Sequence, residues 1–116
     1  MEDRSPGTGA PLNVVQINWV ANPFRGDKFE AAWRGPAEAV MRYGATAWAL
    51  LRSKDDPLHF TQLAVFPEKL GFERYWFSEE LAEARVLAAG LYQQPILPIW
   101  HYSVGFGALA PTPARA

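Results

Sequence analysis

Residues 45–66, ATAWALLRSKDDPLHFTQLAVF, decide the fold of this chain. Both ends of the stretch are rich in apolar, aromatic and β-branched residues, which favour strands. The polar residues 54–57 between them, Lys-Asp-Asp-Pro, are typical of a tight turn. We therefore predict strands over 45–52 and 58–66 that pair as an antiparallel hairpin.

Upstream of the hairpin, residues 12–21 predict a further strand, which Asn22-Pro23 ends. Both faces of this strand are apolar apart from Gln16 and Asn18, which share a face. Between this strand and the hairpin the spacing of apolar residues predicts a helix. We expect Asp27 to cap it, Gly35-Pro36 to interrupt it, and Gly44 to end it.

Downstream of the hairpin, residues 67–77 predict a short helix. Ser78 is placed to cap a second helix, with Glu79 and Glu80 in its first turn, and Gly90 to end it. A last strand is expected over 96–105, where Pro95 and Pro98 indicate a start at a sheet edge.

The resulting order, β-α-β-β-α-β, predicts an α+β, ferredoxin-like fold. Its four-stranded antiparallel sheet carries both helical regions on one face. Residues 12–105 would form a single domain, with a disordered leader over 1–11 and a flexible tail over 106–116. The other face of the sheet is left bare although its strands are apolar on both sides. We therefore expect a homodimer in which two sheets pack face to face.

The composition excludes several classes of protein. The net charge is −1, and the absence of a basic stripe argues against nucleic acid as a partner. The chain has no cysteine, which fits a protein of the reducing cytoplasm. No apolar run approaches the roughly 20 residues that span a membrane. The histidines, His59 and His101, have no carboxylate at a metal-ligand spacing, and no glycine-rich phosphate loop follows a strand. We therefore expect no metal and no bound cofactor.

The passage after the predicted hairpin carries a resemblance to a known family. Together with the element order and the Asp55-Asp56-Pro57 turn, it resembles the antibiotic-biosynthesis monooxygenase superfamily over residues 13–104. Phe66 stands where that family usually has Trp, and Glu68 where it usually has Ser; the remaining matching positions are Phe72, Tyr75 and Ser78. The resemblance implies a dimeric α+β barrel with a ligand pocket between the sheet and the helices. Members include cofactor-free oxygenases, haem-degrading enzymes, quinol-handling enzymes and proteins of unknown role.

The resemblance also bears on haem. Asn18 matches an Asn of the haem-degrading branch, while Tyr75 and Arg85 stand opposite its Trp and its His. Because Arg stays protonated, it cannot replace a neutral imidazole as an iron ligand. Haem degradation by that mechanism is disfavoured, unless His59 or His101 approaches from elsewhere.

Three residues are candidates for catalysis. Asn18 can position a substrate carbonyl or hydroxyl, or simply bond to neighbouring groups in the sheet. Arg85 can hold a phenolate or a peroxide anion, or it can pair with Glu83 or Glu30 or lie with only its stem buried. His101 can act as a general base or as a hydrogen-bonded core residue.

Four further residues are candidates for contact with a substrate, although each can equally be a packing residue: Tyr75, Trp48, Trp100 and Phe66. The first functional hypothesis is a cofactor-independent monooxygenase that acts on an electron-rich aromatic or quinol. The alternative is a non-catalytic, dimeric ligand-binding or accessory protein, and haem binding is the third. Aromatic residues make up 14% of the chain, which suits either a small aromatic ligand or a partner subunit.

Overall fold

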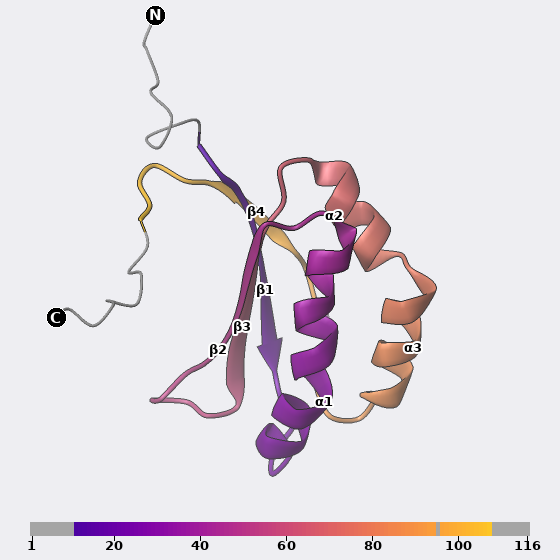
Figure 1. Cartoon of the computed structure of the whole chain (residues 1–116). Coiled ribbons are helices and arrows are strands. Elements are labelled where there is room, and N and C mark those ends of the chain that lie inside the picture. The colour runs from indigo at the N-terminus through magenta and orange to yellow at the C-terminus, as the bar shows by residue number, and fades with distance from the viewer. Residues whose placement is uncertain (1–10, 95, 108–116) are drawn as a thin grey trace, which may run out of the picture.

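The computed structural model describes residues 11–94 and 96–107. Residues 1–10 of the predicted leader and residues 108–116 of the predicted tail lie outside the described residues. Figure 1 shows the elements in the order β1 (Asn13–Val20), α1 (Gly26–Glu38), the 3-10 helix η1 (Ala39–Tyr43), β2 (Ala47–Arg52), β3 (His59–Val65), α2 (Lys69–Trp76), α3 (Glu79–Leu87) and β4 (Ile99–Tyr102).

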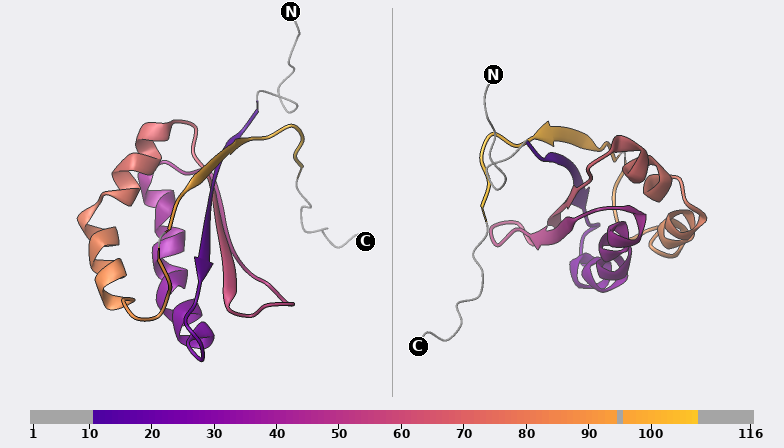
Figure 2. Two further views of the ribbon diagram at one scale, coloured as in Figure 1. Left: turned by 180° about the vertical axis from the view of Figure 1, so that it is seen from behind. Right: turned by 45° about the horizontal axis from the view of Figure 1, so that its top comes forward.

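The four strands form one antiparallel sheet in the order β2-β3-β1-β4. The helices α1, α2 and α3 all lie on the same side of this sheet (Figures 1 and 2). This arrangement confirms the predicted α+β, ferredoxin-like fold. No helix in the described ranges is both long enough and apolar enough to cross a membrane.

The start of α1 differs from the prediction. The N-cap position is Arg25, which makes no side-chain cap, and Asp27 lies inside the first turn. Asp27 is instead bonded to Arg52 of β2, over 2.9 Å between Oδ1 and Nη1. A Cβ atom at Gly26 would lie 3.2 Å from the carbonyl oxygen of Pro57, so the first turn of the helix packs tightly against the hairpin.

The interruption predicted at Gly35-Pro36 is wrong, because α1 continues through Pro36 to Glu38 and then tightens into η1. Gly44 ends η1 with a φ of 100°, as predicted. The cap of α3 is also confirmed, since the Ser78 hydroxyl accepts a hydrogen bond from the backbone N–H of Leu81 at 3.0 Å. The last strand is shorter than predicted and begins only after Pro98, which cannot donate to the ladder.

The core lies between the sheet and the helices. Alternate residues of β1 and β3 face it and are buried, namely Val15, Ile17, Trp19, Phe60, Gln62 and Ala64. From α1, Phe29 and Trp33 pack on Trp19 with ring centroids 5.5 and 4.6 Å away. The core is therefore built largely from aromatic side chains.

Candidate functional site

The centre of the core holds one buried polar side chain, that of Gln62 on β3. Its Oε1 accepts hydrogen bonds from the indole N–H groups of Trp19 and Trp33, each over 3.0 Å. Its Nε2 donates to the hydroxyl oxygen of Tyr75 at 3.1 Å, and that hydroxyl donates to the carbonyl oxygen of Pro36 at 2.8 Å. Sequence reasoning missed Gln62, although its alternation with Phe60 and Ala64 would have placed it on the inner face.

Two of the predicted substrate-contacting residues, Tyr75 and Phe66, lie in this packed interior and are fully buried. Burial raises the pKa of the Tyr75 hydroxyl above its usual value. That hydroxyl already accepts a hydrogen bond from Gln62 and donates one to Pro36. The contacts of Tyr75 in this structure are therefore those of a packing residue.

Arg85 lies on α3 beside the end of α2. Its guanidinium carbon stands 4.6 Å from the centre of the Trp76 ring, and its Nη2 donates to the Trp76 carbonyl oxygen at 3.3 Å. The pairings considered with Glu83 or Glu30 do not form, and among the described residues no carboxylate lies within ion-pair distance of Arg85. This half-buried cation is therefore held by an aromatic face and a carbonyl rather than by an opposite charge.

Tyr92, which follows α3, lies close enough to Arg85 to feel its charge. Burial raises the pKa of Tyr92, and the positive charge of Arg85 opposes that rise. The guanidinium of Arg85 thus lies near aromatic residues of two different parts of the chain, Trp76 of α2 and Tyr92 after α3.

Trp100, a third predicted substrate-contacting residue, extends the aromatic surface from α2 to β4. Its ring meets Phe72 edge to face at 5.4 Å, and Phe72 stacks on Trp76 at 5.6 Å. We call Arg85, Trp76, Phe72 and Trp100 the Arg85 cluster. Trp76 was missed because only the packing of α3 on α2 brings it under the guanidinium.

The other two predicted catalytic residues lie on the opposite face of the sheet, which no helix covers. Gln16 Nε2 donates to Asn18 Oδ1 at 2.9 Å, and His101 Nε2 lies 2.8 Å from Gln16 Oε1. The structure therefore brings Asn18 and His101 together but separates both from Arg85. The cause is the alternation along β1, where Val15, Ile17 and Trp19 take the helix-covered face and leave Asn18 on the other.

His59, the other histidine, projects from the same face as Asn18 and pairs with Asp56. Neither histidine is on the side that carries Tyr75 and Arg85. In the described part of the chain, no three His, Asp or Glu side chains gather as a metal site would require.

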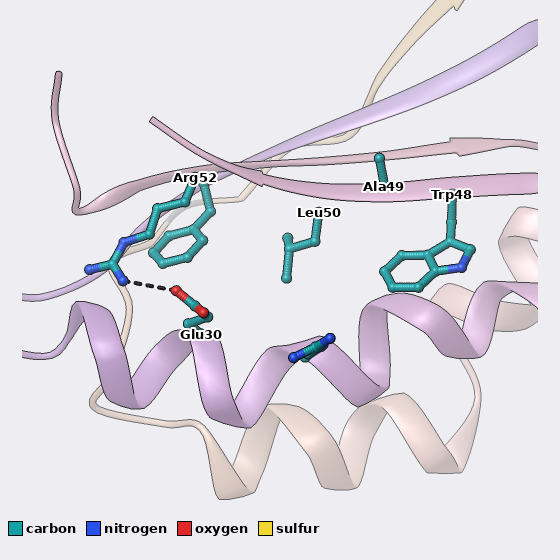
Figure 3. Close-up of a pocket in the computed structure, with 7 residues that line it drawn as sticks. Glu30, Trp48, Ala49, Leu50 and Arg52 are labelled. Atoms are coloured by element: carbon teal, nitrogen blue, oxygen red, sulfur yellow. Dashed lines mark hydrogen bonds and ion pairs between the residues drawn. The ribbon is translucent and has the colours of Figure 1, made fainter. Parts of the chain in front are cut away.

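Trp48, the remaining predicted residue, lies on β2 at the far edge of the sheet from Trp100. Its ring points toward α1, as does the side chain of Leu50 (Figure 3). Together with residues of α1 these side chains line a groove of about 480 Å³. The candidate residues thus fall into three separate places: the Arg85 cluster with its packed neighbours, the uncovered face of the sheet, and this groove.

No protein-family model matches the sequence, and no curated protein matches it. Solved structures do match. A structure from Nitrosomonas europaea matches with a TM-score of 0.71 and 17% sequence identity. The match covers 80% of this chain and 99% of the Nitrosomonas europaea chain. One from Bordetella bronchiseptica shares 21% identity at a TM-score of 0.67 and covers 84% of this chain and 99% of its own. Both are named provisionally as antibiotic biosynthesis monooxygenases.

A further structure, from Bacteroides thetaiotaomicron, shares 10% identity at a TM-score of 0.65 and covers 80% of this chain and all of its own. Its name describes a conserved protein of unknown function and an oxidoreductase only as a possibility. At these identities the matches show a shared fold alone, and they span almost the whole of each matched chain. The resemblance that the sequence suggested is confirmed at this level, that of the fold.

Proposed function

We propose that this chain is a monooxygenase-like protein that binds an electron-rich aromatic or quinol beside Arg85 and oxidises it with molecular oxygen. The observation that carries the proposal is the half-buried guanidinium of Arg85, which has an aromatic face and no carboxylate among the described residues. A phenolate or an enolate supplies the missing negative charge, and its ring matches the aromatic surface of Trp76 and Trp100.

The reaction needs only the substrate and oxygen. With an anthrone, the enolate donates electrons to O₂ and forms a carbon–oxygen bond, giving a peroxide anion. Protonation of this anion and loss of water leave a new carbonyl, so that one oxygen atom enters the product and the other becomes water. Arg85 favours the enolate and then the peroxide, because both are anions next to a fixed cation.

Oxygen uptake by the purified protein with anthrones, dihydroxynaphthalenes and quinols tests this proposal. We expect saturable uptake and a loss of about tenfold or more in kcat/KM for Arg85→Ala, since a charge-assisted hydrogen bond is worth about 1.5–3 kcal/mol. Arg74→Ala removes an exposed arginine of α2 outside the cluster and serves as the matched control. Uptake no faster than without protein, or unchanged in Arg85→Ala, would contradict the proposal.

A non-catalytic binding or accessory role is the second candidate, and the packing of the interior favours it. Trp19, Trp33 and Tyr75 are fully buried and bonded to Gln62, so they fill the centre of the space between the sheet and the helices. This candidate predicts that calorimetry detects binding of the same aromatic compounds while the dissolved oxygen and the compound stay unchanged for hours.

We also propose that the uncovered face of the sheet packs against a second copy of this chain. Among the described strand residues none on this face is Lys, Arg, Asp or Glu; the face consists of Val14, Gln16, Asn18, Val20, Ala47, Ala49, Leu51, His59, Thr61, Leu63, Val65, Ile99 and His101. A hollow of about 190 Å³ near Ala47, Leu63 and Val65 offers a seat for an apolar side chain. In such a dimer Asn18 and His101 would belong to the interface.

A further inference from the structure

The groove between α1 and β2 is separate from the Arg85 cluster. Its lining consists of Glu30 and Arg34 of α1, Trp48, Ala49, Leu50 and Arg52 of β2, and Phe60 of β3. Its volume of about 480 Å³ falls within the range of small-molecule sites, about 300–1,000 Å³. β2 and β4 are the two outer strands of the sheet, so the groove and Trp100 lie at opposite edges.

The inner wall of the groove is apolar and partly flat. Trp48 and Leu50 are half-buried, and they project from β2 toward the helix (Figure 3). The ring of Phe60 lies deeper and is already covered by Arg52, whose guanidinium carbon stands 5.1 Å from the ring centre. The exposed part of the Trp48 ring is therefore the aromatic surface that a planar ligand can stack on.

The charged residues at one end of the groove pair with one another. Arg52 Nη1 lies 2.8 Å from Glu30 Oε1 and 2.9 Å from Asp27 Oδ1, and Arg52 Nε donates to the Pro57 carbonyl oxygen at 2.7 Å. These bonds raise the pKa of Arg52, chiefly through Asp27. Arg52 is thus fixed in place between two carboxylates and has little charge left for a ligand.

Arg34 differs from Arg52 in having no such partner. It lies one turn after Glu30 on the same face of α1, but Glu30 is bonded to Arg52. Among the described residues no carboxylate is within ion-pair distance of Arg34. The lining therefore contains two guanidinium groups against one carboxylate, and the unneutralised cation is Arg34.

We propose that this groove binds a planar aromatic ring that carries a single carboxylate. The ring stacks on Trp48 and contacts Leu50, while the carboxylate takes both N–H groups of the Arg34 fork. A planar guanidinium matches a carboxylate in this bidentate manner. Glu30 disfavours a second negative charge in the ligand, because it stands next to Arg34 and within the same lining.

The test uses 2-naphthoate as the probe, with naphthalene-2-carboxamide as its neutral isostere. The chain has five tryptophans, so a ¹H–¹⁵N spectrum of the indole groups contains one signal for each of Trp19, Trp33, Trp48, Trp76 and Trp100. Trp48→Phe identifies the Trp48 signal by its disappearance. We expect saturable shifts of this signal on addition of 2-naphthoate, with the Trp76 and Trp100 signals unmoved.

Arg34→Ala should weaken 2-naphthoate binding about tenfold and change carboxamide binding by less than about twofold. Arg74→Ala, the matched loss of an exposed arginine on α2, should change neither. The proposal would be overturned if Arg34→Ala bound 2-naphthoate as tightly as the parent. It would also be overturned if only the Trp76 and Trp100 signals moved, which would place the probe at the Arg85 cluster.

This inference does not rest on the proposed oxidation. Arg34→Ala is expected to keep the oxygen uptake of the parent, and Arg85→Ala to keep its affinity for 2-naphthoate. The oxygen-uptake measurement can therefore contradict the proposed oxidation while 2-naphthoate still binds in the groove, and the reverse is also possible.

Discussion

At the scale of single residues, Gln62 has the largest number of buried polar partners in the core. Two indole N–H groups and one hydroxyl depend on its amide. A buried donor without an acceptor costs about 1–3 kcal/mol, whereas a satisfied network adds specificity to the packing. Gln62 therefore determines how Trp19, Trp33 and Tyr75 are arranged, although it has no role in the proposed chemistry.

Gln62→Leu should lower the free energy of unfolding by about 2–5 kcal/mol, because it leaves the indole groups of Trp19 and Trp33 without an acceptor while nearly keeping the volume. Urea unfolding measures the loss. Gln93→Leu, at an exposed position, is the matched control and should change stability by about 0.5 kcal/mol or less. Equal effects of the two substitutions would show that the network contributes nothing.

Tyr75 makes the stability depend on pH in the alkaline range. Burial raises its pKa in the folded protein above the value near 10 that it has in the unfolded chain. The unfolded chain therefore loses this proton first, and stability is complete below about pH 10 and falls above it. The slope approaches about 1.4 kcal/mol per pH unit for one group.

Tyr75→Phe should remove this part of the dependence. Below pH 10 the parent should have the larger free energy of unfolding, because Tyr75→Phe lacks the hydroxyl that bonds to Gln62 and Pro36. We expect this excess, measured by urea unfolding between pH 8 and 11, to shrink as the pH rises above 10. A difference that stays constant or grows with pH would mean that Tyr75 keeps an ordinary pKa.

At the scale of elements, the contact of α2 with η1 depends on one glycine. A Cβ atom at Gly71 would lie 2.7 Å from the carbonyl oxygen of Tyr43 and 3.1 Å from the Phe66 ring. The nearer atom belongs to the backbone, so it cannot turn aside as a flexible side chain would. Glycine is thus required at this position by the packing, even though it weakens the helix by about 1 kcal/mol relative to alanine.

Gly71→Ala should destabilise the protein by about 1–3 kcal/mol in thermal or urea unfolding, since overpacking outweighs the gain in helix propensity. Gly35→Ala is the matched control, because a Cβ atom there meets nothing within 4 Å. We expect it to stay within about 0.5 kcal/mol of the parent, as its helix preference is offset by the restriction that Pro36 imposes. If Gly71→Ala were as stable as Gly35→Ala, the contact between α2 and the Tyr43 carbonyl oxygen would leave room for a methyl group.

At the scale of the whole molecule, the two faces of the sheet differ in what covers them. The three helices cover one face and leave the other open (Figure 2). The strand residues described on the open face include no Lys, Arg, Asp or Glu, and many of them are apolar. A group of exposed apolar residues on one face is typical of surfaces that bind a partner. The dimer proposed above would close it without changing the helix-covered side, where Arg85 and the groove lie.

Leu63→Lys places a charge in the middle of this face and should convert a dimer into a monomer in analytical ultracentrifugation. Leu70→Lys, at an exposed leucine of α2, should leave the dimer intact. Unchanged far-UV circular dichroism in both variants would show that the sheet still forms. A parent protein that sediments as a monomer at high micromolar concentration would contradict the proposed dimer.

The sequence by itself determined the elements and their order. The hairpin at residues 54–57, the cap at Ser78 and the end of η1 at Gly44 depend on neighbours in the chain, so local patterns were sufficient to predict them. It also placed Gln16 and Asn18 on a common face of the first strand, because alternation is a property of the strand alone. It was wrong at Asp27, which bonds to the distant Arg52 instead of capping the helix. It was also wrong at Gly35-Pro36, where α1 continues and the Pro36 carbonyl oxygen accepts a hydrogen bond from the distant Tyr75.

Only the tertiary structure decided which candidate residues meet. Alternation divides a strand into two faces but does not say which face the helices will cover. The sequence therefore left open whether Asn18 and Arg85 share a pocket, and the structure places them on opposite sides of the sheet. The tertiary structure also decided that Trp76 lies against Arg85 and that Gln62 bonds to Trp33. It pairs Glu30 with Arg52, so Arg34 is the cation of the described groove lining that no carboxylate pairs with. These contacts join residues far apart in the chain. They form because whole elements pack together to bury apolar surface, a condition that no local pattern contains.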